Sequence, residues 1–590
     1  MNGAAANSIS QRIVDDRRSA HLNLAVNVFS YAILLGGAAT IFLTIYLIFV
    51  SYSCLPHWDG WSQIDFGANE GTPFALDWLW RQQNQHRLVL PKMFLLADLR
   101  WFRATQVFLL ASIFAIQLLH LVLLSWSMRV FGGWRGALWR TGIGLAAFCL
   151  FCPSQWENFT WGFQTCFVLP ALFATLSFIG LLLYWTRSGR EFSRRGSWKY
   201  LLLSIAAALG ATYSLSNGNL LWPLLLTAAL LLRVRLAAIV SYAVAGVAST
   251  ALYLNNYTVY PTVMSSARTP IAVFKYLAVY FGSTWVPSGL RAAEIIGLAG
   301  FVVVLFLLVS LPTYIRNCRL LPIQLVLTLL FCLGTGLITA LGRLVFGIAQ
   351  AFASRYQTIA LLFWCCLGLI LLEIVSLLRD VRDRALLLSQ TVLLAGMLVA
   401  ACLAQTPLIS ARLHGFEINA AAMALVTGVP DSAQLQWADS HPDYPRSLVP
   451  YLRSERLSVF SEPEPSYLGQ PLDSVFGLAS ADDCLGKVES STVITSTWPR
   501  SLRITGWAWD SEDRRPPAKI AVTSDGVITG LGTVGGWRPK QETNNARMTS
   551  HFTGFIAYVR DVSRSSRVDI YAVPRQSGKL ACHIATLSPE

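Results

Sequence analysis

The sequence predicts a polytopic α-helical membrane protein that ends in a soluble, strand-rich domain. Hydrophobic residues make up 54% of the 590-residue chain and charged residues only 13%, whereas soluble domains carry about 25% charged residues. Long apolar runs recur from residue 24 to residue 404. From about residue 484 apolar and polar residues alternate with period two, which is typical of β-strands.

Eleven apolar runs are candidates for transmembrane helices, each of which needs about 20 residues. They lie at 24–52, 104–128, 141–152, 165–186, 200–215, 219–232, 236–254, 292–314, 321–341, 357–378 and 385–404. The shorter runs must include flanking residues to reach the required length. The apolar stretch 271–290 contains Lys275, Gly282 and Pro287, and we interpret it as interfacial or re-entrant.

Basic residues predict the orientation, because loops rich in Arg and Lys stay in the cytoplasm. They cluster in alternate loops, as Arg12, Arg17, Arg18, Arg129, Arg135, Arg140, Arg187, Arg190, Arg194, Arg195, Lys199, Arg233, Arg235, Arg316, Arg319, Arg379, Arg382 and Arg384. Residues 1–23 are then cytoplasmic and form no cleavable signal peptide. Eleven crossings place the chain after residue 404 outside, in the periplasm if this is a bacterial inner-membrane protein. The net charge of +14 arises from these clusters, so we do not expect nucleic-acid binding.

The cysteines agree with this orientation. Nine of the eleven lie in or beside apolar runs, where a thiol is usually a small buried hydrophobe. Cys484 and Cys582 instead bracket the C-terminal segment, which indicates a disulfide and an oxidising compartment.

The C-terminal part divides into two predicted regions. Residues 405–483 form a connecting region in which short helical patterns alternate with proline-rich turns. Residues 484–590 are expected to form an antiparallel β-sandwich, with strands near 488–497, 501–509, 519–523, 552–559, 567–573 and 579–587. Trp507, Trp509 and Trp537 could stack on sugar rings, as in a carbohydrate-binding domain, although we expect core positions for them.

Polar and aromatic residues concentrate in the loops that are predicted to lie outside. The motifs are His57-Trp58-Asp59-Gly60-Trp61, the Gln85-His86-Arg87 segment, 153–164, Ser216-Asn217-Gly218, and 342–356 with Arg343, Arg355 and Tyr356. Polar groups at membrane depth are costly unless they face a cavity or a partner. The predicted cytoplasmic loops are short and offer little besides arginine, so we expect a functional site on the outer face.

The residue types in these loops suit glycosyl transfer from a lipid-linked donor. A carboxylate can act as general base on an acceptor hydroxyl, and arginine or histidine can hold a phosphate and stabilise charge that develops on it. Amides and tryptophans match sugar hydroxyls and ring faces. A nucleotide-sugar enzyme would need a cytosolic site, and the absence of a Walker motif or a dinucleotide-type glycine loop argues against ATP-driven transport.

The chain resembles the GT-C superfamily of integral membrane glycosyltransferases. The resemblance covers the architecture of the whole chain and the motifs His57–Trp61, Gln85–Arg87, Gln155–Gln164, Ser216–Gly218 and Gly342–Tyr356. It is greatest for bacterial members that use polyprenyl-phosphate sugars, such as arabinofuranosyl- and mannosyltransferases or pilin-glycosylating enzymes. Some arabinofuranosyltransferases of the superfamily also carry a C-terminal β-sandwich.

The resemblance implies that Asp59 is the catalytic carboxylate. Many relatives have two adjacent acidic residues at this point, whereas Gly60 follows here. Asp59 therefore acts alone, or Asp65 or Glu157 supplies a second carboxylate. The complete candidate site comprises Asp59 as base; His86, Arg87, Arg343 and Arg355 as ligands of the donor phosphate; and Asp65, Glu157, Gln164, Asn217 and Tyr356 as substrate-binding residues.

Each candidate also has a structural interpretation. Asp59 could cap the first helix, His86 and Arg87 could anchor the chain at the interface, and Glu157 could pair with an arginine. Gln164 and Asn217 could form hydrogen bonds between helices. Asp59, Asp65 and His86 could in principle bind a divalent ion. No cluster has convincing metal-ligand spacing, however, so we assign no metal.

The sequence is compatible with three functions. The leading hypothesis is an inverting transfer of one sugar, such as arabinofuranose, mannose or glucose, to a surface glycan or a pilin-like protein. A polymerase or oligosaccharyltransferase would instead use a glycan on a diphosphate lipid. A flippase or transporter of lipid-linked sugars would require polar residues through the middle of the membrane and inverted repeats, and neither is clear in the sequence.

Overall fold

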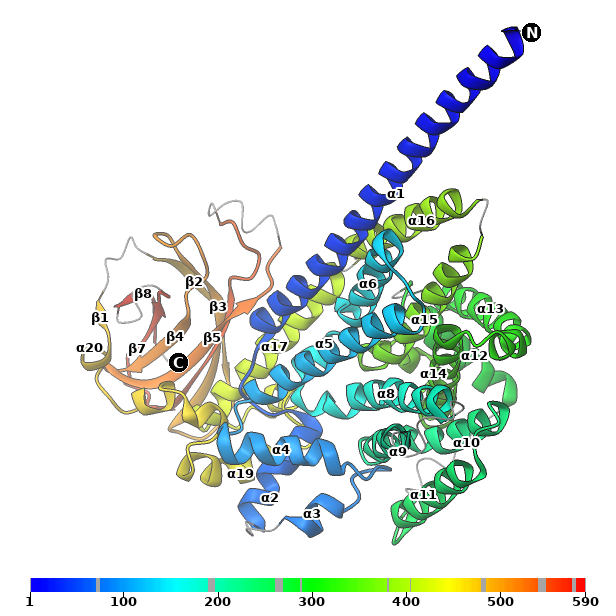
Figure 1. Ribbon diagram of the computed structural model, residues 1–590. Coiled ribbons are helices and arrows are strands. Elements are labelled where there is room, and N and C mark those ends of the chain that lie inside the picture. The colour runs from blue at the N-terminus through cyan, green and yellow to red at the C-terminus, as the bar shows by residue number, and fades with distance from the viewer. Residues whose placement is uncertain are drawn as a thin grey trace.

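The computed structural model describes residues 2–70, 75–188, 197–259, 269–286, 289–378, 381–403, 405–478, 484–539, 548–575 and 580–588. A helical bundle forms most of it, and a β-sheet domain lies beside one end of the bundle (Figure 1). Arg190, Arg194, Arg195, Arg379, Pro287 and the predicted strand start at Lys579 lie outside the described residues.

The bundle is built from α1 (Asn2–Ser51), α5 (Val107–Val130), α6 (Gly136–Leu150), α8 (Thr165–Ser188), α9 (Trp198–Thr212), α10 (Leu221–Leu231), α11 (Leu236–Leu254), α12 (Pro270–Gly282), α13 (Leu290–Arg316), α14 (Leu320–Arg343), α15 (Gln357–Ser376) and α16 (Arg382–Leu403). Within the described residues, nine helical segments are long and apolar enough to cross a membrane. Helices α9 and α10 coincide with two further predicted runs but have only 15 and 11 residues.

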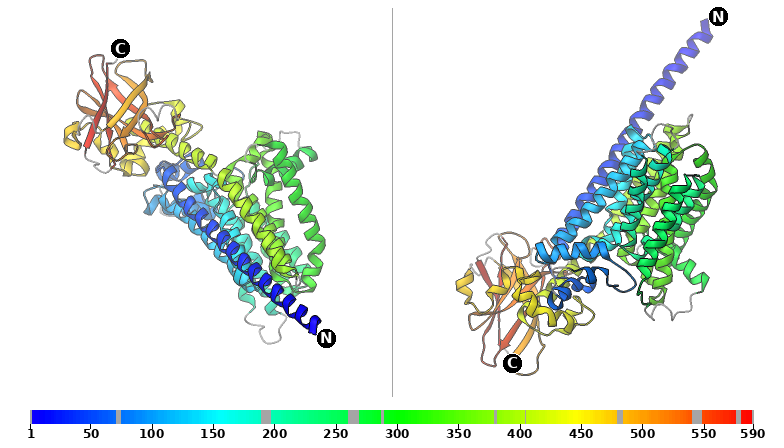
Figure 2. Two further views of the ribbon diagram at one scale, coloured as in Figure 1. Left: turned by 90° about the horizontal axis from the view of Figure 1, so that it is seen from above. Right: turned by 60° about the horizontal axis from the view of Figure 1, so that its bottom comes forward.

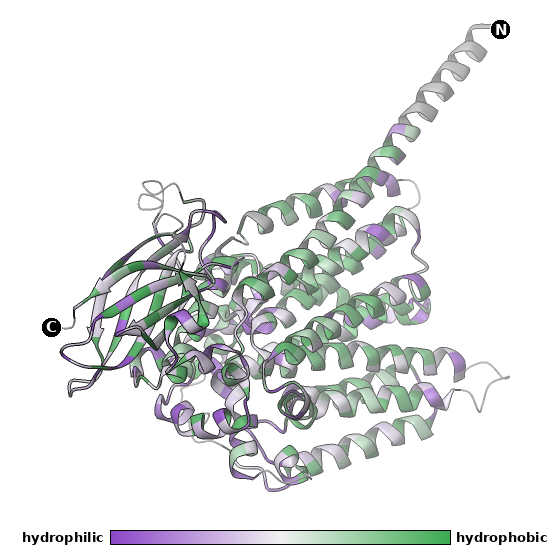
Figure 3. Cartoon of the chain, turned by 90° about the vertical axis from the view of Figure 1, so that its left-hand side faces the viewer, coloured by the Kyte–Doolittle hydropathy of each residue, from purple (hydrophilic) through white to green (hydrophobic). Residues whose placement is uncertain are grey.

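The helices of the bundle are apolar along most of their length, and polar residues gather near their ends (Figure 3). This distribution agrees with a multi-pass membrane protein, the class that the composition predicts. Helix α12 occupies the segment that we interpreted as interfacial or re-entrant. It has 13 residues and packs along α13 and α14; like α9 and α10, it is shorter than the roughly 20 residues that a membrane crossing needs.

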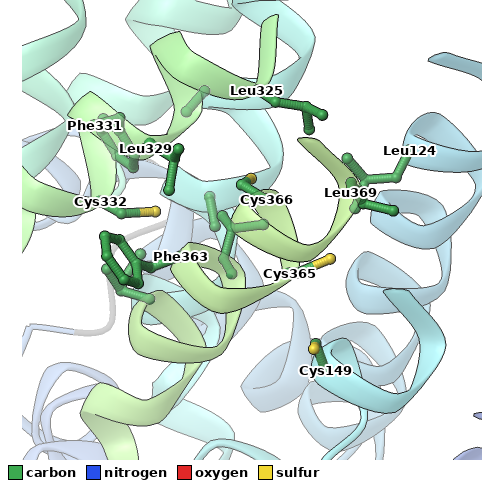
Figure 4. Close-up of a cluster of buried hydrophobic side chains, with 14 of the residues drawn as sticks. Leu124, Cys149, Leu325, Leu329, Phe331, Cys332, Phe363, Cys365, Cys366 and Leu369 are labelled. Atoms are coloured by element: carbon green, nitrogen blue, oxygen red, sulfur yellow. The ribbon is translucent and has the colours of Figure 1, made fainter. Parts of the chain in front are cut away.

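Buried thiols fill part of the space between helices. Cys332, Cys365 and Cys366 are fully buried, and Figure 4 shows them among leucine and phenylalanine side chains. They behave as small hydrophobes, as predicted. Cys318 is the exception among the described free cysteines, because it is exposed.

Loops and short helices cover the end of the bundle that faces the sheet, which we call the sheet end. The first long loop joins α1 to α5 and contains η1 (Trp58–Trp61), α2 (Ser62–Asn69), α3 (Leu76–Trp80) and α4 (Val89–Trp101). The turns η2 (Pro153–Gln155), η3 (Gly162–Gln164), η4 (Ser216–Leu220), η6 (Leu344–Phe346), η7 (Ile348–Phe352) and η8 (Ser354–Tyr356), together with α7 (Trp156–Thr160), complete this end.

The connecting region begins with one long helix, which we did not predict, and the short helical elements follow it. Helix α17 (Gln405–Thr427) follows α16 and carries the chain from the bundle to the sheet (Figure 2). It packs against β5 and β6. Beyond it the elements are short: α18 (Ser432–Leu435), α19 (Asp443–Ser454), η9 (Ser458–Ser461), η10 (Glu464–Tyr467) and α20 (Leu472–Val475).

The C-terminal strands form one connected sheet in the order β1-β8-β7-β4-β5-β6-β3-β2. They are β1 (Gly477–Leu478), β2 (Cys484–Val493), β3 (Arg500–Asp510), β4 (Lys519–Ser524), β5 (Val527–Gly536), β6 (Gly554–Val562), β7 (Val568–Val573) and β8 (Leu580–Leu587). Neighbouring strands are antiparallel, except that β1 is parallel to β8. The C-terminal domain thus contains a single sheet that curls around its own core, and the two separate sheets of the predicted sandwich are not seen among the described residues.

The predicted disulfide between Cys484 and Cys582 is present, with a Cα–Cα distance of 6.1 Å. It joins β2 to β8, which stand near opposite ends of the strand order. Leu502, Ile520 and Ile570 share the core that the curl encloses. Trp509 is buried, as expected of a core residue, whereas Trp537 is half exposed.

Candidate functional site

A cavity of about 500 Å³ opens at the sheet end of the bundle, and we call it the Asp59 cavity. Its lining comes from the first long loop, α7, η3, α8, the end of α14 with the turns that follow it, and α17. The lining residues are His57, Trp58, Asp59, Asn84, Gln85, Glu157, Trp161, Phe163, Gln164, Phe167, Gly342, Arg343, Val345, Phe346, Arg355 and His414. Five predicted site residues therefore meet here from distant parts of the chain: Asp59, Glu157, Gln164, Arg343 and Arg355.

Asp59 lies in the η1 turn that directly follows the first helix. Two hydrogen bonds fix this turn against the connecting region: the Trp58 N–H donates to the Ala438 carbonyl at 2.7 Å, and the Trp61 indole donates to the same carbonyl at 3.1 Å. Trp58 has a left-handed φ of 49°, which closes the turn tightly. The carboxylate of Asp59 is therefore held in place by the fold and accepts a hydrogen bond from Asn84 at 3.3 Å.

The surroundings of Asp59 raise the pKa of its carboxyl group above the ordinary value. Burial is the main cause, and the negative charge of Asp439 adds to it. Hydrogen bonds from Asn84 and Gln83 and the positive charge of Arg343 act in the opposite direction without cancelling the effect. A carboxylate with a raised pKa is a stronger base. Proton transfer by a general base is most efficient when its pKa lies near the operating pH, so this shift favours such a role.

A second cavity, of about 370 Å³, lies beside the first, and we call it the Tyr356 cavity. It is lined by Gln85, His86, Phe167, Leu215, Ser216, Asn217, Tyr257, Val259, Tyr280, Thr335, Ile338, Thr339, Leu341, Gly342, Arg343, Tyr356 and Ile359. Four of these residues, Gln85, Phe167, Gly342 and Arg343, also line the Asp59 cavity. The two cavities are therefore neighbours, and Arg343 belongs to both.

Arg343 brings a positive charge to the junction of the cavities. Its guanidinium carbon lies 5.8 Å from the ring centre of Phe346, and no salt bridge to it is seen within the described ranges. Its charge contributes to lowering the pKa of Asp59 and that of His86. An arginine that lines a cavity and has no salt bridge within the described ranges is suited to bind a phosphate or another anion.

Arg355, in contrast, is engaged with Glu157. Its guanidinium lies 3.1 Å from one carboxylate oxygen of Glu157, and its backbone N–H donates to the other oxygen at 2.9 Å. The Ser354 hydroxyl donates to the same carboxylate at 2.7 Å. Glu157 thus has the ion pair that the structural interpretation predicted, and the pair forms part of the cavity wall.

His86 lies in the Tyr356 cavity and is neutral near pH 7. Burial and the charge of Arg343 lower the pKa of its imidazole to about 4. The ring can exchange hydrogen bonds with a ligand but adds no positive charge to a phosphate site. Of the predicted phosphate ligands in the cavities, the arginines supply the charge.

Two predicted residues lie outside both cavities. Arg87 is buried, and its guanidinium donates to the carbonyls of Trp80, Tyr253 and Asn255. These bonds fasten the first long loop to the end of α11, and Arg87 is not among the residues that line the two cavities. Asp65 lies on α2, where it accepts a hydrogen bond from Asn69 at 2.8 Å, and it does not join Asp59.

Gln164 and Asn217 are buried amides that face the cavities. Gln164 is inaccessible to solvent, and among the described residues neither polar atom of its side chain has a hydrogen-bond partner. Asn217 donates to Thr335 at 3.1 Å, while its amide oxygen has no such partner. Buried polar groups are nearly always satisfied, so the unpaired atoms of these two amides call for a partner that the described residues do not supply.

His414 is a member of the site that the sequence did not predict. It reaches the Asp59 cavity from α17, and its ring centre lies 5.2 Å from that of His57. The His57 ring in turn packs against the Trp161 ring at a tilt of 32°, with 4.7 Å between ring centres. No local pattern marks His414, because its place depends on the packing of α17 against the first long loop.

No group of three or more His, Cys, Asp or Glu residues within the described ranges is arranged to hold a metal ion. The three residues that we considered for a divalent ion are separated: Asp59 and His86 line different cavities and Asp65 lines neither. We therefore assign no metal to these three residues.

No protein-family model matches the sequence, and no curated protein sequence matches it. The fold and the site by themselves define a helical, multi-pass membrane protein. Its sheet end carries a cavity lined by carboxylates, arginines, amides and aromatic side chains. A functional assignment therefore depends on the chemistry of that cavity.

Proposed function

We propose that this protein is a membrane glycosyltransferase of the GT-C type that moves one sugar from a polyprenyl-phosphate donor to an acceptor hydroxyl. The main support is the position of Asp59 and Arg343, a candidate base and an anion-binding cation, on one cavity at the end of an apolar bundle. Amides and aromatic rings in the same lining match sugar hydroxyls and ring faces.

The proposed topology has eleven crossings, with α9 and α10 counted among them. It places the N-terminus in the cytoplasm, and the sheet end, α17 and the sheet in the periplasm of a bacterial inner membrane. The disulfide between Cys484 and Cys582 supports this orientation, because disulfides persist in oxidising compartments.

In the proposed reaction, Asp59 removes the proton from the acceptor hydroxyl as its oxygen attacks the anomeric carbon. The bond between that carbon and the phosphate oxygen breaks, and the configuration inverts. Arg343 stabilises the polyprenyl phosphate that leaves. The apolar wall of the Tyr356 cavity, with Ile338, Leu341 and Ile359, suits the isoprenoid units next to the phosphate.

The charge distribution favours a monophosphate donor over a diphosphate. Of the two arginines in the Asp59 cavity, Arg355 is paired with Glu157, and only Arg343 has no salt bridge within the described part of the chain. A diphosphate carries more negative charge and would call for further cations. This supports transfer of a single sugar over transfer of a whole glycan from a diphosphate lipid.

The test compares surface glycans and surface proteins by mass spectrometry in cells that produce the wild type, Asp59→Asn or Asp65→Asn at equal levels. Asp65 is a matched control, since it lies on the same loop outside the cavities. A loss of one pentose or hexose only in Asp59→Asn supports the proposal and names the acceptor. An unchanged mass in Asp59→Asn would refute the assigned base, and loss of a longer glycan would favour the diphosphate reaction.

A further inference from the structure

A third cavity, of about 230 Å³, lies beside α16, and we call it the Gln357 cavity. Its lining comes from the residues that follow α12, the start of α15, the end of α16 and the start of α17, among others. Val399 and Leu403 of α16 form its rim and are exposed. Helix α16 is a candidate membrane span, so its exposed side would contact lipid beside this cavity.

The floor of the Gln357 cavity is an ordered network of hydroxyl and amide groups. The buried Gln357 side chain donates to the Ser283 hydroxyl at 2.8 Å and accepts from the Thr284 hydroxyl at 3.0 Å. The rings of Trp156 and Trp285 complete the lining. Hydroxyls, an amide and tryptophan rings are the groups that recognise sugars, through hydroxyl contacts and through apolar ring faces.

The lining of this cavity contains no arginine, lysine or histidine and no carboxylate among the described residues. The Asp59 and Tyr356 cavities, in contrast, share Arg343. A lipid phosphate would find no cation in this lining, so the donor headgroup does not belong there. A neutral headgroup meets no such obstacle.

Only a thin wall separates the Gln357 cavity from the Asp59 cavity. Trp156 and Ser354 line the first, and their immediate neighbours Glu157 and Arg355 line the second. Helix α17 runs past both: Ser410 lines the Gln357 cavity, and His414, one turn further, lines the Asp59 cavity. Residues four apart share one face of a helix, so a single face of α17 extends along the two cavities.

We propose that the Gln357 cavity binds the neutral saccharide headgroup of a lipid-anchored acceptor, whose apolar tail lies along α16. At about 230 Å³ the cavity is smaller than the roughly 300–1,000 Å³ of pockets that enclose a whole ligand, and this suits a headgroup alone. The role of this glycolipid as the acceptor rests on the proposed glycosyl transfer. The binding of a neutral glycolipid in the cavity does not depend on it. Transfer to this acceptor then requires the wall at the Glu157–Arg355 pair to open, because the wall separates the bound headgroup from Asp59.

The binding test uses an octyl glucoside that carries a photoactivatable diazirine on its alkyl chain. The full-length protein is reconstituted in nanodiscs of phosphatidylethanolamine and phosphatidylglycerol. Two variants are compared, Val399→Trp at the rim and Leu398→Trp beside it; both native side chains are 61% exposed, and only Val399 lines the cavity. We expect saturable labelling of the segment 399–410 that falls at least about five-fold in Val399→Trp and is unchanged in Leu398→Trp.

Competition tests the headgroup. Unlabelled octyl glucoside should displace the probe, whereas octyl phosphate and octanol should not. Equal labelling of both variants, or equal displacement by octanol, would overturn the proposal, because the cavity would then take only an alkyl chain. Displacement by octyl phosphate as strong as that by octyl glucoside would also overturn it.

Activity separates this inference from the proposed function. Val399→Trp should raise the KM for the acceptor and leave the KM for the donor unchanged. If Asp59→Asn remains active while the labelling behaves as expected, the assignment of Asp59 as the base fails and the glycolipid site stands. If Asp59→Asn is inactive and labelling ignores Val399→Trp, the acceptor site fails and the reaction stands.

Discussion

The side-chain amide of Asn84 donates a hydrogen bond to the carboxylate of Asp59 over 3.3 Å. The bond links the η1 turn to a distant part of the first long loop, so two separate parts of that loop contribute to the cavity. Since a hydrogen bond to the charged form of a carboxylate lowers its pKa, Asn84 limits the rise that burial causes. A change at Asn84 should therefore alter the titration of the proposed base.

Replacing Asn84 with Ala removes the hydrogen bond and should raise the pKa of Asp59. A general base works only when deprotonated, so the acid limb of the pH profile of kcat/KM should move to higher pH. The matched control is Asn69→Ala, which removes a similar bond from Asp65 outside the cavities. An acid limb that stays in place in Asn84→Ala would mean that Asp59 is not the titrating base.

The second prediction concerns Arg343. Arg343→Gln removes the cation that we assign to the donor phosphate, so kcat/KM should fall about 10- to 100-fold, as expected for a lost charge-assisted hydrogen bond. It should also move the acid limb to higher pH, because the charge of Arg343 lowers the pKa of Asp59. Arg343→Lys keeps the charge and should retain the wild-type pH profile. Steady-state kinetics with a polyprenyl-phosphate sugar would check both effects, and an unchanged profile in Arg343→Gln would contradict the electrostatic link.

Gln164→Leu separates ligand binding from helix packing. Neither polar atom of the Gln164 side chain has a hydrogen-bond partner within the described ranges. An apolar residue of similar size should therefore leave the midpoint temperature of thermal unfolding unchanged or slightly higher. The KM for the sugar donor should rise, since the ligand loses an amide partner. A drop in the midpoint without a change in KM would show that Gln164 is structural.

The Glu157–Arg355 pair should stabilise the fold. A double-mutant cycle with Glu157→Gln and Arg355→Gln is expected to give a coupling free energy of about 0.5–3 kcal/mol, as for partners in one network. The matched control is the exposed pair of Asp443 and Arg446, whose coupling should stay below about 0.5 kcal/mol. The measurement is denaturant unfolding of the protein in detergent, and equal coupling in the two cycles would contradict the assignment.

Loss of the disulfide should destabilise the sheet domain. The bond closes a loop with a sequence separation of 98, and removal of a native disulfide typically costs about 2–5 kcal/mol. Cys484→Ser should therefore make the C-terminal domain sensitive to protease at lower urea concentrations. Cys318→Ser, at an exposed free cysteine, should behave as the wild type. Identical protease profiles for the two variants would show that the curled sheet is stable without the crosslink.

The sequence already predicted the features that depend on local patterns. Hydropathy located the bundle helices because a segment in lipid must be apolar over its whole length. Period-two alternation found most strands but neither the two-residue β1 nor β5. The glycines of β5 hide its alternation, and packing needs them: a Cβ on Gly530 would lie 2.3 Å from the carbonyl oxygen of Tyr558, and one on Gly532 would lie 2.5 Å from the Cβ of Ala557.

The membership of the site was predictable only in part. Asp59, Glu157, Gln164, Arg343 and Arg355 carry polar groups in loops between apolar runs, and this unusual placement identified them. The same reasoning also selected Arg87 and Asp65, because composition cannot show whether a side chain points into a cavity. The carbonyls of Trp80, Tyr253 and Asn255 occupy the Arg87 guanidinium, and only the approach of α11 to the first long loop creates that arrangement.

The sequence by itself determined the apolar bundle, the soluble C-terminal domain and the cysteine pair, because each follows from the composition or spacing of nearby residues. The tertiary structure decided which polar groups meet. It brought His414 of α17 next to His57, set Arg343 between two cavities, and placed the Gln357 cavity behind the Glu157–Arg355 pair. Such contacts join residues hundreds of positions apart, and packing between helices, which leaves no local signal in the sequence, controls them.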